Sequence, residues 1–175
     1  MKKIVFFDVT GTLVYPKKTK NKENPGFLYS KYSKRADAYG YMTLTPHAKQ
    51  TLLELKKKGI KRVVVSAVSD GTGPEEIRKM LKYFAISHLF DEIHTINFNT
   101  KGGKAPKVTS ILNRLGISKK SALMVGDAYW ADYRLVRDSG VDAVLFYSEW
   151  QRSIRPVARR VSRVIRDLNE IFKYI

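Results

Sequence analysis

The chain has 175 residues and no cysteine, which excludes disulfides, thiol catalysis and thiolate metal sites. Its 33 basic and 16 acidic residues give a net charge of +17, which favours anionic ligands and allows non-specific nucleic-acid binding. An ordinary hydrophobic share of 43%, with no apolar run of about 18 residues, predicts one domain over residues 1–175 and no membrane span.

The first predicted strand ends at an aspartate. Ile4 to Phe7 is a short, wholly apolar run, typical of a strand buried on both faces of a parallel sheet. Asp8 then falls at the carboxyl end of that strand, where open α/β sheets bind their ligands. Gly11 suits a tight turn just afterwards. Because cleavage of this N-terminus as a signal peptide would remove Asp8, we expect a cytoplasmic protein.

The segment 15–41 interrupts the α/β pattern. It is rich in Lys, Asn, Gly and Tyr and has no sustained hydrophobic period. We predict a short flap near the site, and the alternative is a basic loop without regular structure. Its tyrosines, interleaved with lysines, could stack on nucleic-acid bases, although such tyrosines more often pack a loop onto its domain.

Helices alternate with buried strands through the rest of the chain. The expected helices begin at Thr45–Pro46 (with Thr45 as N-cap), Pro74, Pro106 and Tyr129, and the expected strands cover residues 62–66, 91–96, 121–125 and 141–147. A short segment at 161–165 and a closing helix follow. This alternation implies right-handed crossovers and a three-layer α/β/α sandwich around a mostly parallel, Rossmann-like sheet of five to six strands.

A second apolar run, Leu123 to Gly126, also ends at an aspartate, Asp127, and Asp132 follows about one helical turn later. Two strand ends in one parallel sheet could bring Asp8, Asp127 and Asp132 into a single crevice. Carboxylates that lie so close together raise each other's pKa unless a cation neutralises them. Oxygen ligands without Cys or clustered His favour Mg²⁺. Singly, each aspartate could be a turn or capping residue, but the set predicts a metal site.

These residues resemble the motifs of the haloacid dehalogenase superfamily of phosphoryl-transfer enzymes. The run DVTGT from Asp8 to Thr12 is similar to the first motif, Asp-x-Asp-x-Thr, with Thr10 in the third position. Ser66, which closes the strand VVVS, resembles the Ser or Thr of the second motif, and GDAYWAD resembles the acidic pair of the fourth. Order and rough spacing agree over residues 1–147.

The third motif of the superfamily is a lysine before a helix. Lys104 in KGGKAPK is the nearest candidate, and Lys101 and Lys107 compete with it. A lysine there would offset the charge of Asp8 and of the transferring phosphoryl group.

The resemblance implies a minimal-cap, Mg²⁺-dependent phosphatase for a small phosphorylated substrate, in which Asp8 attacks phosphorus and forms an aspartyl-phosphate. The implied ligands of the ion are Asp8, the backbone carbonyl of Thr10, Asp127 and Asp132. The implied partners of the phosphoryl oxygens are Ser66, the backbone amide of Ala67, and Lys104.

Thr10 departs from the family pattern. Family phosphatases commonly carry a second Asp there, which protonates the leaving group, and such help is typically worth roughly 10² to 10⁴ in rate. P-type ATPases carry Asp-Lys-Thr-Gly-Thr, so Thr is compatible with forming the phosphoaspartate. We therefore expect a modest phosphatase, or one whose acid comes from the substrate or from the flap, where Glu23 and Asp37 are candidates.

Two other functions stay open at this stage. One is a weakly or non-catalytic relative that binds nucleic acid or another polyanion through its basic surface, including the arginine run at positions 152, 155, 159, 160, 163 and 166. An intermediate case is a phosphatase acting on nucleic-acid ends. The second alternative function is that of a dehalogenase. It is disfavoured because those relatives carry a larger cap and do not need an acidic metal cluster. We expect a monomer or homodimer without a membrane partner.

Overall fold

A parallel sheet forms the centre of the computed structural model, which describes residues 1–17, 38–69, 73–147 and 161–175. The strands are β1 (Ile4–Phe7), β4 (Lys61–Val68), β5 (Glu92–Asn97), β6 (Ala122–Gly126), β7 (Asp142–Phe146) and β8 (Val164–Ile165). Their order is β5-β4-β1-β6-β7-β8, and every neighbouring pair is parallel. The predicted three-layer architecture and Rossmann-like sheet are confirmed.

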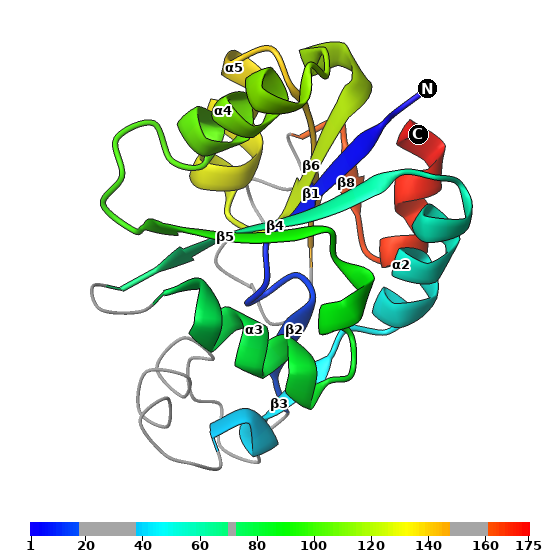
Figure 1. The fold of residues 1–175 in the computed structure, drawn as a ribbon, viewed down its shortest axis with the longest axis vertical. Coiled ribbons are helices and arrows are strands. Elements are labelled where there is room, and N and C mark those ends of the chain that lie inside the picture. The colour runs from blue at the N-terminus through cyan, green and yellow to red at the C-terminus, as the bar shows by residue number, and fades with distance from the viewer. Residues whose placement is uncertain (18–37, 70–72, 148–160) are drawn as a thin grey trace.

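Helices cover both faces of the sheet (Figure 1). The elements on one face are α4 (Ala105–Leu115) and α5 (Leu135–Asp138), and those on the other are α2 (Ala48–Lys57), α3 (Pro74–Tyr83) and the 3-10 helix η6 (Leu168–Tyr174). Side chains alternate between faces along a strand, so Phe6 packs in the α4 core and Phe7 in the α2–α3 core. This two-sided burial explains why β1 is apolar at every position.

Strand β4 extends further than the sequence predicted. Its last residues, Ser66 to Val68, pair with Thr95 to Asn97 of β5 after β1 has ended. The expectation that Ser66 closes the strand is therefore wrong by two residues. Since Phe7 stands opposite Val64, Ser66 lies level with the chain just beyond Asp8.

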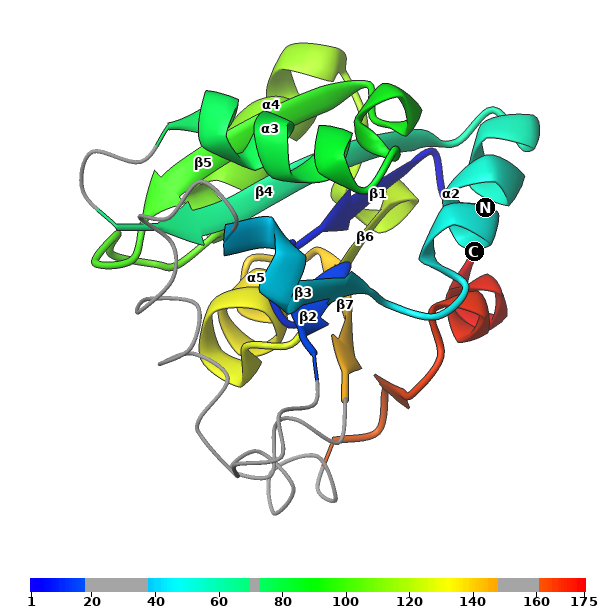
Figure 2. The same ribbon diagram turned by 90° about the horizontal axis from the view of Figure 1, so that it is seen from below.

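The predicted flap, residues 15–41, lies largely outside the described residues, and so do Glu23 and Asp37. Its first residues belong to β2 (Val14–Pro16), and β3 (Met42–Leu44), which follows its last residue, pairs with β2 in an antiparallel ribbon near the end of β1 (Figure 2). A 3-10 helix, η1 (Ala38–Tyr41), packs on α3, with 5.8 Å between the ring centroids of Tyr39 and Tyr83.

Helix α2 begins at Ala48 rather than next to Thr45. The Thr45 hydroxyl donates to the carbonyl of Thr12 at 2.6 Å, so it is used to hold the loop after β1 instead of capping the helix. His47 takes the N-cap position in the left-handed conformation, at φ 62. The N-cap prediction for Thr45 was therefore wrong.

The helix expected to begin at Tyr129 forms in two parts. A π-helical segment, η4 (Tyr129–Arg134), is followed by the short α5. The remaining short 3-10 turns are η2 (Ser87–Leu89) and η3 (Lys119–Ser121). Of the predicted arginine run, only Arg163 and Arg166 fall in the described residues. No helix in the described ranges is long and apolar enough to cross a bilayer.

The two chain ends lie near each other at the amino ends of the strands (Figures 1 and 2). The last element, η6, begins at a capping box on Asp167. The Asp167 side chain accepts from the amide of Asn169 at 2.8 Å, and Glu170 accepts from the amide of Asp167 at 3.1 Å. His47 also contacts Asp167 at 2.6 Å, which links η6 to the start of α2.

We predict that Asp167→Ala lowers the free energy of unfolding by about 1 kcal/mol, because it removes the N-cap oxygen of η6. Urea denaturation measures the change. Asp167→Asn is the matched control, since Asn keeps a capping oxygen, and it should retain most of the stability. Equal stability of the Ala variant and the wild type would contradict the capping role.

Candidate active site

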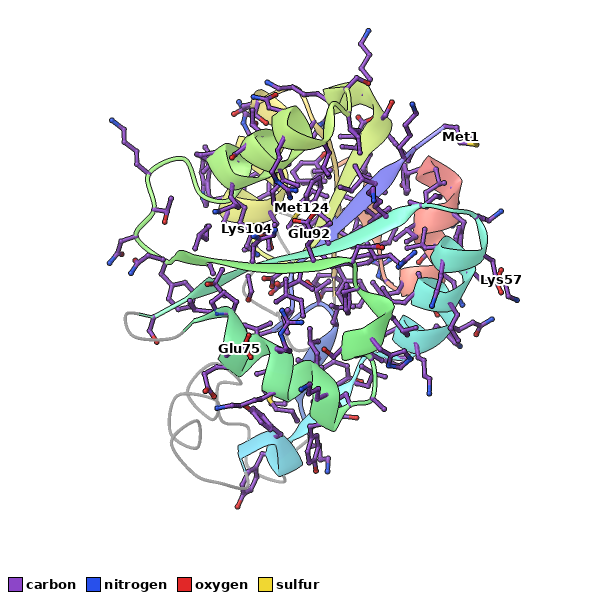
Figure 3. All side chains as sticks on the ribbon, in the orientation of Figure 1. Met1, Lys57, Glu75, Glu92, Lys104 and Met124 are labelled. Atoms are coloured by element: carbon purple, nitrogen blue, oxygen red, sulfur yellow. The ribbon has the colours of Figure 1, made fainter. Side chains whose placement is uncertain are left out.

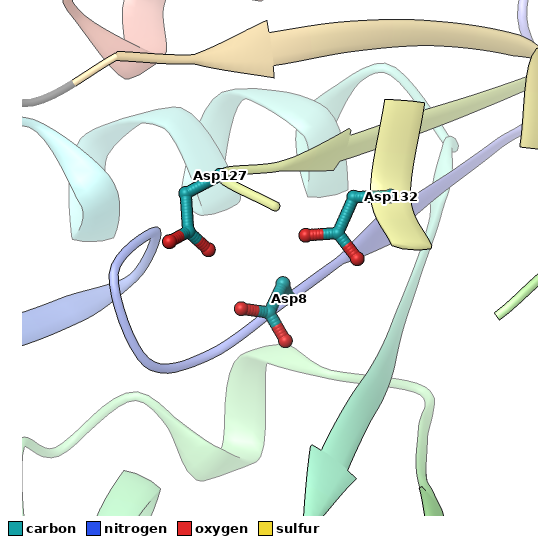
Figure 4. Close-up of side chains that lie close together, drawn as sticks. All are labelled: Asp8, Asp127 and Asp132. Carbon is teal, nitrogen blue, oxygen red and sulfur yellow. The ribbon is translucent and has the colours of Figure 1, made fainter. Parts of the chain in front are cut away.

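Three carboxylates meet at the carboxyl ends of β1 and β6 (Figure 4). One oxygen from each of Asp8, Asp127 and Asp132 lies within 4.8 Å of the other two. Phe7 stands opposite Val125 in the sheet, and the Asp8 amide donates to the Val125 carbonyl at 2.9 Å. Strand pairing therefore places Asp8 beside Asp127, although 118 residues separate them in the chain.

Asp132 reaches the cluster from the π-helical segment η4. Its Oδ2 accepts from the Ala128 amide at 3.0 Å, and its own amide donates to the Ala128 carbonyl at 2.9 Å. Gly126 makes room for this carboxylate, because a Cβ there would stand 2.2 Å from Asp132 Oδ2. A side chain at the end of β6 would thus displace Asp132 from the cluster.

The loop after β1 is fitted closely to Asp127. Gly11 has φ +93, and a Cβ on it would lie 2.3 Å from Asp127 Oδ2. The Thr12 hydroxyl donates to Asp127 Oδ1 at 3.2 Å, and Thr45 holds the carbonyl of Thr12. The tight turn predicted at Gly11 is confirmed, and its role is to let the backbone approach a carboxylate.

Lys104 is the buried cation of the cluster. Only 2% of the residue is exposed, and its ammonium contacts Asp8 Oδ1 and lies 2.7 Å from Asp132 Oδ1. Figure 3 shows it between the start of α4 and the sheet. Lys101 is exposed and Lys107 partly exposed, and neither contacts a carboxylate of the cluster. Of the three candidate lysines, Lys104 is the one at the site.

The loop that carries Lys104 is packed against η4. Gly103 has φ +59, and a Cβ there would meet Ala131 Cα at 3.0 Å. Sequence reasoning missed this role and those of Gly126 and Thr45. A signal was present for the glycines, because Gly at a strand end or beside a functional residue often marks a close approach of two backbones.

Burial and mutual charge shift the pKa values in the cluster. Burial raises the pKa of Asp127 well above its ordinary range, and the charges of Asp8 and Asp132 raise it further. Burial raises the pKa of Asp132 to about 6 against the opposing charge of Lys104. Burial alone would lower the pKa of Lys104, but Asp132 and Asp8 outweigh it and raise that pKa above its ordinary value.

The donor set of the cluster fits Mg²⁺. With all groups ionised, three carboxylates and one ammonium leave a net charge of −2, which a divalent cation would neutralise. Asp132 Oδ1 is buried and, apart from its ion pair with Lys104, makes no hydrogen bond of good geometry among the described residues. Oxygen donors with unused lone pairs are the ligands that a hard cation requires.

The other predicted site residues lie beside the cluster rather than in it. Thr10 is half-buried in the loop after Asp8 and forms an isolated bridge with Val14. Ser66 is 3% exposed and Ala67 half-buried, both inside β4, the neighbour of β1. The hydroxyls of Thr10 and Ser66 make no hydrogen bond to the described part of the chain. The structure therefore brings four predicted residues into contact and leaves three nearby.

The sequence model of the haloacid dehalogenase-like hydrolase family matches residues 5–146. A glyceraldehyde 3-phosphate phosphatase of Pyrococcus furiosus is 24% identical in an alignment of 140 residues that covers 77% of this chain and 57% of the relative. The chain thus spans just over half the length of that curated relative.

Solved structures share the fold over nearly their whole length. An uncharacterized protein from Listeria monocytogenes serotype 4b has a TM-score of 0.72 at 25% identity, over 98% of this chain and 96% of that one. A predicted phosphoglycolate phosphatase from Haemophilus somnus has a TM-score of 0.71 at 19% identity, over 99% and 97%. Since the family match covers most of the chain and includes both aspartate strand ends and Lys104, the chain belongs to the haloacid dehalogenase-like hydrolase family.

Proposed function

We propose that the protein is a Mg²⁺-dependent phosphatase that hydrolyses phosphate monoesters through an aspartyl-phosphate on Asp8. The observation that carries the proposal is the meeting of Asp8 and Asp127, at neighbouring strand ends, with the buried side chains of Asp132 and Lys104. The family supports a hydrolase, and relatives named for small phosphorylated compounds support a small phosphate ester as substrate.

Asp8 is the proposed nucleophile. Lys104 contacts Oδ1 of Asp8, which leaves Oδ2 to attack phosphorus. The bond from phosphorus to the leaving oxygen breaks, and the alcohol departs after gaining a proton. Water then attacks phosphorus, so that inorganic phosphate leaves and the carboxylate of Asp8 is restored.

The remaining residues would hold the ion and the phosphoryl group. The proposed ligands of Mg²⁺ are Asp8, the Thr10 carbonyl, Asp127 and Asp132. When bound, the ion supplies charge neutralisation and polarises the phosphoryl group. The proposed partners of the phosphoryl oxygens are Ser66, the Ala67 amide and Lys104. We propose residues 15–41 as the cap of the site.

We predict that Asp8→Asn lowers Mg²⁺-dependent hydrolysis of phosphate monoesters by at least about 10³-fold, because the covalent route is lost. A phosphatase panel with Mg²⁺ and with EDTA measures it. Glu54→Gln, which removes an exposed carboxylate paired with Lys57 on α2, is the control and should keep full activity. Activity retained by Asp8→Asn would contradict the assignment of Asp8 as the nucleophile.

We predict that Mg²⁺ raises the melting temperature, and that the rise increases with pH from about 5 to about 7.5. The pKa of Asp132 is raised to about 6 and that of Asp127 is also raised, so the metal-free fold loses stability as pH rises above the ordinary carboxyl range. The ion binds the ionised carboxylates and offsets that loss.

Scanning calorimetry with and without Mg²⁺ measures the rise. Asp127→Asn should abolish it, and Glu75→Gln, which removes an exposed carboxylate on α3, should leave it unchanged. A shift of the same size at both pH values, or one that persists in Asp127→Asn, would contradict metal binding by these carboxylates.

We predict that Thr10→Asp speeds the hydrolysis of alkyl phosphates by up to about 10²- to 10⁴-fold, because threonine cannot protonate a poor leaving group. Aryl phosphates leave without that help, so their rate should change much less. Steady-state kinetics on one ester of each kind makes the comparison. Equal rates of variant and wild type on the alkyl ester would refute the missing-acid argument.

A further inference from the structure

Thr45 does not take the local role that its sequence position favours. A threonine followed by proline suits the N-cap of a helix, because its hydroxyl can accept from a free amide of the first turn. Helix α2 instead begins at Ala48, and His47 holds the N-cap position without a side-chain cap. His47 is also left-handed, at φ 62, which is costly for a residue with a Cβ. Two unfavourable local features at one helix start indicate that Thr45 is needed elsewhere.

Thr45 bonds to the loop after β1. Its hydroxyl donates to the Thr12 carbonyl at 2.6 Å, and its amide donates to the Leu13 carbonyl at 2.8 Å. Thr45 is 4% exposed and Thr12 is fully buried. Within the described part of the chain, the Thr45 hydroxyl is the one donor to the Thr12 carbonyl. The buried carbonyl therefore depends on Thr45, because a buried acceptor without a partner is unfavourable.

Thr12 connects Thr45 to the carboxylate cluster. Figure 4 shows the loop after β1 running beside Asp127. The Thr12 hydroxyl donates to Asp127 Oδ1 at 3.2 Å, so the residue that Thr45 holds by its carbonyl holds Asp127 by its side chain. Gly11 lies against the same carboxylate, since a Cβ there would stand 2.3 Å from Oδ2. Because the loop fits Asp127 this closely, a shift of the loop changes the orientation of that carboxylate.

We propose that Thr45 is a positioning residue for the divalent cation. By holding Thr12, it fixes the orientation of Asp127 and so sets the affinity of the carboxylate cluster for Mg²⁺. This rests on the metal site of the function proposed above. Groups that hydrogen-bond a metal ligand typically contribute about 10- to 100-fold to metal affinity. Since Thr45 acts through Thr12 rather than directly, we expect an effect at the low end of that range.

Isothermal titration calorimetry of the full chain with Mg²⁺ tests the proposal. Thr45→Val keeps the size of the side chain but removes the hydroxyl, and it should raise Kd about 10-fold. Thr45→Ser keeps the hydroxyl and should stay near the wild-type Kd. Thr51→Val is the matched control, because it removes another buried hydroxyl, which donates to Asn169 Oδ1 at 2.7 Å between α2 and η6. It should lower the melting temperature about as much as Thr45→Val but leave Kd unchanged.

A double-mutant cycle tests the route through Thr12. Thr12→Val removes the hydroxyl that contacts Asp127 and leaves the bonds of Thr45 in place, so it serves even if Thr45→Val does not fold. It should raise Kd about 10- to 100-fold. Adding Thr45→Val should raise Kd little further, because both changes act on one contact.

The outcomes separate this proposal from the phosphatase function. An unchanged Kd in Thr45→Val or in Thr12→Val, an equal rise in Thr51→Val, or full additivity in the cycle would overturn the positioning role. If wild type binds Mg²⁺ but hydrolyses no phosphate ester, the phosphatase function fails alone, and the Kd values still decide the role of Thr45. If wild type binds no Mg²⁺, both proposals fail.

Discussion

The ion pairs of Lys104 with Asp8 and Asp132 are the interaction on which the site depends. Each of these side chains is less than a tenth exposed, and taking a charge out of water costs several kcal/mol unless it is paired. The pairing therefore stabilises three separate parts of the chain against one another: the end of β1, the loop before α4 and the π-helical segment η4. The same contacts position Asp8, and the three ionised carboxylates still outweigh the one ammonium, so the cluster stays negative enough to attract a divalent cation.

Backbone geometry makes this concentration of charge possible. Adjacent parallel strands, β1 and β6, bring Asp8 and Asp127 together, and each close approach is made at a residue without a side chain. Gly11 admits Asp127 and Gly126 admits Asp132. The wide turn of η4 provides the third carboxylate, in keeping with the frequent use of π-helical turns at functional sites.

The sheet, its layers and the meeting of Asp8 with Asp127 were predictable, because buried parallel strands are apolar throughout and their carboxyl ends share one edge. The choice among Lys101, Lys104 and Lys107 was not, since three lysines in one loop differ only in tertiary contacts. The end of β4 was predicted two residues too early, because its position depends on pairing with β5 and the residues VVVSAV do not indicate that pairing. Local sequence does not show that the Thr45 hydroxyl bonds to the carbonyl of Thr12 instead of capping α2. In contrast, the Asp-x-x-Glu pattern that begins at Asp167 is a capping-box signal that could have been recognised.

The central claim is that Asp8 bonds covalently to phosphorus during turnover. Threonine at position 10 should slow hydrolysis of the intermediate, because no carboxylate at that position activates water, and slow hydrolysis favours trapping it. Acid quenching during steady-state turnover, followed by peptide mass spectrometry, measures the intermediate directly. We predict one added phosphoryl group on the peptide that contains Asp8, lost on treatment with hydroxylamine. Turnover with no phosphorylated peptide, or with the phosphoryl group on another residue, would contradict the account.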